Sequence, residues 1–184
     1  MKPKHYLIIV IVFSVLSAGG LSSGRSAEKG IADVKMKGPS VVWSGANSAI
    51  AGPAYMRITS ERQWRDLWLR HSGIKPKDHD ELHNSPCIPT VDFRRFMVIA
   101  VFVGKRNCTQ GIRVRPAAED AKLLRVRYNV QFYAHFRKDI TTPYGILVLP
   151  RVSKSVIVEE MGANDAKGKP TWHKKQEFPP LKKK

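Results

Sequence analysis

The pattern of apolar and polar residues along the chain predicts a body made mostly of β-strands. Apolar side chains alternate with polar ones, or form short apolar runs, between turn-forming residues that recur about every 8–12 positions. The run at 96–103 is almost entirely apolar, which is typical of a strand covered on both faces. Strands are predicted at 41–43, 54–59, 96–103, 111–115, 123–130, 145–149 and 155–158. We therefore expect a mainly β (α+β) fold, with an antiparallel sheet or a small sandwich.

One helix interrupts the strand pattern, at about residues 60–71. Ser60 stands at the N-cap position and Gln63 follows three residues later, which is the capping-box arrangement. Beyond this cap, apolar and aromatic side chains recur at helical spacing: Trp64, Leu67, Trp68 and His71. We expect this face to pack onto the sheet rather than to bind a ligand.

The two ends of the chain differ from this central region. Residues 1–27 resemble a secretory signal, because Lys2 and Lys4 precede an uncharged apolar run at 6–18 and then small residues. The run is short for a membrane-crossing helix, which needs about 20 residues, so a retained anchor is the less favoured alternative. We expect cleavage between residues 18 and 27, and an exported protein that is periplasmic, attached to the cell envelope or secreted. Residues 28–39 are predicted to be a linker, 40–162 a folded domain, and 163–184 a basic, disordered tail.

The composition narrows the possible partners. The 184 residues include 32 Lys and Arg against 15 Asp and Glu, a formal net charge of +17. This length suits one compact domain with short extensions, and the apolar content is too high for a wholly disordered chain. The charge favours an anionic partner such as an envelope polymer, lipid head groups or an acidic protein surface. Nucleic acid fits the charge, but an exported protein is unlikely to meet it.

Several short motifs resemble the family named for PrcB, an accessory subunit of a bacterial protease complex. They span about residues 44–160 and comprise Ser44-Gly45, Ala49-Ile50, Gln63-Trp64, Leu67-Trp68, Val91-Asp92-Phe93, Gly104, Gly111, Thr142-Pro143-Tyr144 and Pro150. The resemblance implies a PrcB-like, β-rich domain of the cell envelope that binds a protein partner, is not an enzyme and carries no cofactor. This chain has Gln110-Gly111 where members of the family show a pair of glycines, and it lacks a cysteine for lipid attachment.

An arginine pattern is the strongest indication of a binding surface. If the apolar residues of 111–115 and 123–130 share the core face, strand parity places four arginines on the opposite face: Arg113, Arg115, Arg125 and Arg127. Like charges across a strand pair are mildly destabilising, and we expect scarcely a carboxylate near this patch. We hypothesise that this face meets an anionic partner. The alternative is a solvated basic face without a partner.

Candidate catalytic and metal-binding residues are few. His79 and His83 are four residues apart, but Asp80 follows the first histidine where a zinc protease has glutamate, and prolines confine the segment. We therefore predict a polar loop without a metal, and a metal-dependent hydrolase is the weakest alternative. The chain has no recognisable nucleophile or phosphate-binding motif, so no catalytic residue is assigned.

Cys87 and Cys108 are the only cysteines. In an oxidising compartment they could form a disulfide that closes a loop of about 20 residues and stabilises the fold by about 3 kcal/mol. The alternative is two separate thiols.

Overall fold

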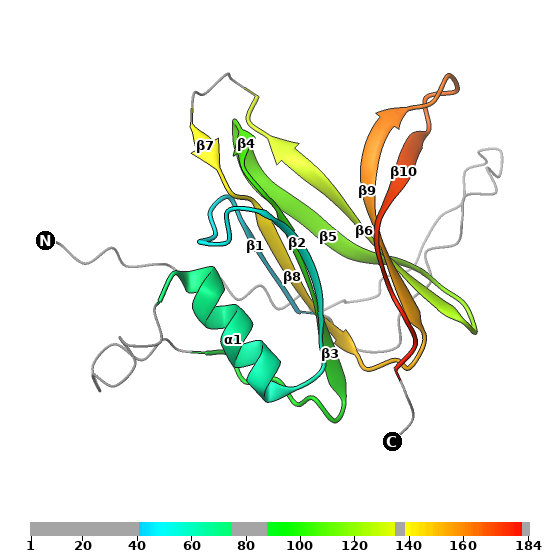
Figure 1. The fold of residues 1–184 in the computed structure, drawn as a ribbon. Coiled ribbons are helices and arrows are strands. Elements are labelled where there is room, and N and C mark those ends of the chain that lie inside the picture. Colours follow the sequence, from blue (N-terminus) through cyan, green and yellow to red (C-terminus); the bar gives the residue numbers. More distant parts are fainter. Residues whose placement is uncertain (1–40, 75–87, 135–138, 182–184) are drawn as a thin grey trace, which may run out of the picture. The chain divides into compact units, whose positions relative to one another are not determined.

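The computed structural model describes residues 41–74, 88–134 and 139–181. In these residues two four-stranded sheets, a two-stranded ribbon and one helix make up the regular structure (Figure 1). The expected mainly β fold with a single capped helix is confirmed. No helix in the described part of the chain is long and apolar enough to cross a membrane.

The first sheet is antiparallel throughout. Its strand order is β1 (Val41–Gly45), β8 (Tyr144–Pro150), β3 (Phe96–Val103) and β2 (Pro53–Ile58). Residues 97–103 of β3 are buried at every position. Both faces of this strand are covered, as its continuous apolar run predicted, because the helix packs on one face and the second sheet on the other.

The second sheet contains one parallel pair. Its strand order is β10 (Pro170–Phe178), β9 (Ser155–Asn164), β6 (Leu123–Phe132) and β5 (Thr109–Glu119). The β5–β6 and β9–β10 pairs are antiparallel, whereas β6 and β9 are parallel. Between them the chain crosses to the first sheet as β8, which supplies the long connection that a parallel pair needs. The ribbon joins β4 (Arg106–Asn107) to β7 (Ile140–Thr141).

The C-terminal segment differs from its prediction. Instead of a disordered tail at 163–184, the structure shows β9 continuing to Asn164, a turn, and then β10 along the sheet edge. The Asp165 carboxylate accepts the N–H groups of Lys167 and Lys169 and so closes the turn. The sequence pattern hid β10 because it is rich in lysine and because a register shift between Lys174 and Gln176 breaks its alternation. The predicted signal at 1–27 and linker at 28–39 lie outside the described residues.

Helix α1 (Glu61–Ser72) packs against the first sheet through tryptophan. The Ser60 side chain accepts the Gln63 N–H, as the capping box predicted, and Gly73 ends the helix at a φ of 73°. The rings of Trp43, Trp64 and Trp68 lie within 5.0–5.9 Å of one another between centroids. Trp64 also donates its indole N–H to the Pro89 carbonyl at 2.7 Å, so its polar atom has a partner in the core.

Arg57 links strand β2 to the turn before β9 and to the residues just after β10. Its guanidinium donates to the carbonyls of Lys154 and Pro179, each at 3.0 Å, and to the carbonyl of Val152. Burial, together with the charge of Arg151, lowers the pKa of Arg57 below its usual value. A partly buried cation with three carbonyl acceptors therefore joins β2, the β8–β9 turn and the residues after β10.

We predict that Arg57→Met lowers the free energy of unfolding by about 2–3 kcal/mol, because the carbonyls lose charge-assisted hydrogen bonds. Chemical denaturation measures this loss. Arg62→Met, on the exposed side of α1, is the matched control and is expected to have no effect. Equal midpoints for the two variants would show that the Arg57 contacts do not stabilise the fold.

Candidate anion-binding face

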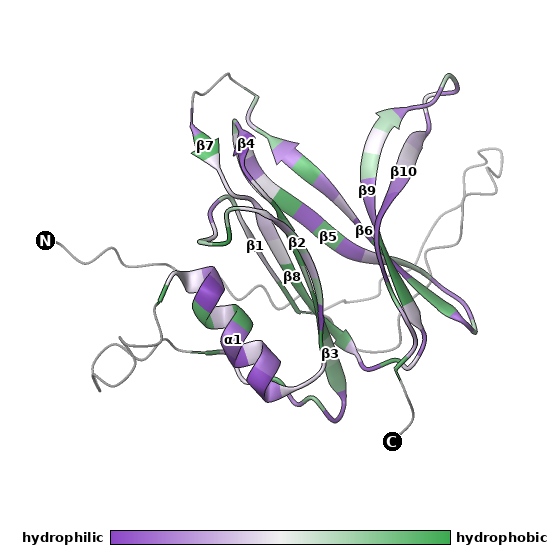
Figure 2. Cartoon of the chain, in the orientation of Figure 1, coloured by the Kyte–Doolittle hydropathy of each residue, from purple (hydrophilic) through white to green (hydrophobic). Residues whose placement is uncertain are grey.

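The arginines named from the sequence lie on the outer face of β5 and β6. Bands of hydrophobic and hydrophilic residues alternate along β5 in Figure 2, and the apolar residues of both strands are buried between the sheets. Arg115 lies directly opposite Arg127, and Arg113 lies opposite Asn129. A register shift between Pro116 and Ala118 places Arg125 opposite Ala118.

Glu159 of β9 binds two of these arginines. Its carboxylate accepts from Arg125 Nη1 at 2.9 Å and from Arg127 Nε at 2.8 Å, and its side chain is only 10% exposed. Arg127 also stacks over the ring of Trp172 in β10, 4.4 Å from the centroid. The expectation of few nearby carboxylates is therefore wrong for β6. Sequence reasoning missed Glu159 because a parallel pairing brings it to Arg127 from 32 residues away.

Arg113 and Arg115 differ from this bonded pair. Both side chains are exposed, and neither forms an ion pair or a side-chain hydrogen bond with any residue that the structure describes. They are two positions apart on one strand, which corresponds to about 6.6 Å along β5. The predicted four-arginine face thus consists of two bonded arginines and two that present their charge to solvent.

A contact between Ser48 and His71 has the residue types of a nucleophile and its base. Ser48 Oγ lies 2.9 Å from His71 Nδ1, and burial lowers the pKa of His71 to about 4. The imidazole tautomer determines which of these two atoms donates, and Ser48 Oγ also accepts the Ile50 N–H at 3.1 Å. Thr142 fixes the serine backbone through its Oγ1, at 2.8 and 2.6 Å. These bonds tie the β1–β2 loop to α1, and among the described residues no carboxylate orients the histidine as a catalytic base would require.

The other predicted site residues receive no test. His79, His83 and Cys87 lie outside the described residues, so the polar-loop interpretation and the possible disulfide stay predictions. Cys108 is half-buried, with a φ of 61° where β4 leads into β5. Within the described ranges, no three His, Cys, Asp or Glu side chains gather as metal ligands would.

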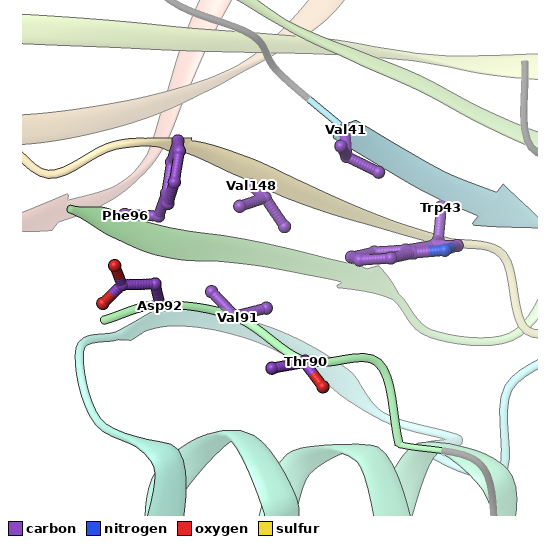
Figure 3. Close-up of a pocket in the computed structure, with 7 residues that line it drawn as sticks. All are labelled: Val41, Trp43, Thr90, Val91, Asp92, Phe96 and Val148. Carbon is purple, nitrogen blue, oxygen red and sulfur yellow. The ribbon is translucent and has the colours of Figure 1, made fainter. Parts of the chain in front are cut away.

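A shallow groove of about 230 Å³ lies beside strand β1 (Figure 3). Its walls are mainly apolar and include Val41, Trp43, Phe96 and Val148. The one carboxylate on its rim, Asp92, accepts the Arg94 N–H at 3.0 Å and so closes the turn before β3. The groove therefore offers mainly apolar contact, and Thr90 and Asp92 are the polar residues of its lining in the described structure.

We predict that His71 makes stability fall with acidification. Above pH 6.5 the histidine is neutral in both states; as the pH falls from 6.5 to 4, only the unfolded chain takes up the proton. Allowing for partial exposure, the native state should lose about 1–2 kcal/mol over this window. Denaturation of His71→Gln at several pH values should show a shallower slope there, and an unchanged slope would remove His71 as the cause.

We also predict that Glu159→Gln breaks the ion pairs of Arg125 and Arg127 on the outer face of β5 and β6. The free energy of unfolding should fall by about 1–3 kcal/mol, because Arg125 and Arg127 lose their shared carboxylate. Retention on an anionic resin should rise at the same time, since both guanidinium groups become available. Glu177→Gln, at an exposed ion pair with Lys174, is the control, and it removes the same charge. Equal gains in retention for the two variants would contradict a specific role for Glu159.

Comparisons of the chain with protein-family models, curated proteins and solved structures returned no match. The resemblance to the PrcB family therefore rests on the short motifs alone.

Proposed function

We propose that this protein is an exported, non-catalytic binding domain that holds an anionic partner on the outer face of β5 and β6. The observation that carries this proposal is the contrast between the two arginine pairs. Glu159 bonds Arg125 and Arg127, whereas Arg113 and Arg115 are exposed without a carboxylate in the described structure. Arg115 also lies opposite Arg127, and like charges at opposite positions destabilise a strand pair slightly, with no contact in the described residues to offset this cost at Arg115.

The partner class that we favour is a protein of the cell envelope, such as a secreted protease or another envelope complex that the domain stabilises or anchors. The PrcB-like motifs support this choice, and the signal-like pattern at 1–27 supports export. A non-catalytic role agrees with the Ser48–His71 contact, whose hydrogen bonds belong to packing.

An electrostatic binder of anionic polymers or lipid head groups is the second candidate. The formal net charge of +17 favours it, since long-range attraction needs no specific contact. Affinity purification from the native envelope at two salt concentrations separates the two candidates. Recovery of one protein in a fixed stoichiometry that stays bound at high salt supports the accessory role. Recovery of many anionic species that dissociate at high salt supports the electrostatic role.

We predict that Arg113→Glu/Arg115→Glu lowers affinity for the envelope fraction about tenfold at low salt. Binding is measured by co-sedimentation, and circular dichroism checks that the fold persists. The control is Arg62→Glu/Arg65→Glu, which makes the same change in net charge at exposed positions of α1. If the two double variants lose affinity equally, total charge and not this face determines binding.

A further inference from the structure

The spacing of Arg113 and Arg115 restricts what can bind them. Residues i and i+2 of a strand project to the same side about 6.6 Å apart, which is also the spacing of alternate side chains in another extended chain. A guanidinium group binds a carboxylate or a phosphate through two parallel hydrogen bonds in a fixed plane, and carboxylates are the anionic groups that a peptide itself carries. Two such groups in a row therefore match two carboxylates carried on every second residue of an extended peptide.

The neighbouring groups on β6 limit the partner further. Asn129 lies opposite Arg113 and can add an amide hydrogen bond, whereas Arg127, opposite Arg115, is already bonded to Glu159 and stacked on Trp172. In the described structure, the unbonded arginines of this face are therefore Arg113 and Arg115, so two anionic groups of a partner each find an unbonded guanidinium there.

Pro116 interrupts the main-chain donors of β5 directly after the two arginines. β5 is the last strand of its sheet, so an extended partner could otherwise pair with its edge. Pro116 has no N–H to donate, and a register shift follows it. Recognition by the exposed side chains of Arg113 and Arg115 is therefore favoured over long main-chain pairing.

We propose that the anionic partner presents an extended acidic segment with carboxylates at alternate residues, which lies along β5 so that Arg113 and Arg115 each bind one carboxylate. This inference rests on the proposed function and names the chemistry of its partner.

Two isomeric, dye-labelled hexapeptides test this register. One carries two glutamates separated by a threonine, and the other carries the same two glutamates side by side among the same threonines. Fluorescence anisotropy at low salt should show that the native protein binds the alternating isomer about fivefold more tightly. Arg113→Lys/Arg115→Lys keeps the charge but removes the planar forks, so this variant should bind the two isomers equally. Arg62→Lys/Arg65→Lys is the matched control and should keep the native preference.

Equal binding of the two isomers by the native protein would overturn the alternate spacing of carboxylates in the partner. The proposed function would still stand if Arg113→Glu/Arg115→Glu weakened binding to the envelope fraction. A preference that survives Arg113→Lys/Arg115→Lys would also overturn the assignment to these two side chains. A short polyphosphate is the probe for the polymer alternative. Polyphosphate could bind the native protein more tightly than the alternating peptide does, with the same affinity for Arg113→Lys/Arg115→Lys. The partner would then be a polymer held by charge, and the acidic peptide would be excluded.

Discussion

The burial of strand β3 on both faces is the constraint on which the rest of the fold depends. A strand with apolar side chains on both sides must be covered twice, because either face left in water would lose the hydrophobic stabilisation that holds the domain together. Helix α1 and its tryptophans cover one side, and the second sheet covers the other. The second sheet is then free to present its opposite face to solvent, and that face carries the arginines.

The charge on that outer face is determined by a strand pairing rather than by the number of arginines. Because β6 and β9 run parallel, Glu159 lies beside Arg127 and reaches Arg125 as well. One nearly buried carboxylate therefore fixes two cations in place, and Trp172 covers part of the second. The arginines without an ion pair in the described structure lie on β5, so the unbonded charge occupies a narrower surface than four equivalent arginines would form.

The C-terminal strand has a structural role that its composition conceals. β10 supplies Trp172 to the arginine face, and Lys175 bonds Glu160 of β9 at 2.6 Å, so the lysines that suggested a solvated tail are partly used in pairing. Arg57 then joins β2 to the residues just before β9 and just after β10 through three carbonyl oxygens. Removal of the segment that follows β9 would therefore affect both the sheet edge and the packing of Arg127 on the outer face of β5 and β6.

Local patterns in the sequence determined the elements whose cause is itself local. The cap of Ser60 and Gln63, the doubly covered strand at 96–103 and the outward arginines of β5 and β6 all follow from periodicity, because helix and strand geometry fix which side chains share a face. Only the tertiary structure decided that Glu159 bonds Arg125 and Arg127 while Arg113 and Arg115 stay exposed. That division depends on a pairing between strands far apart in the chain, and no local period encodes which distant strands become neighbours.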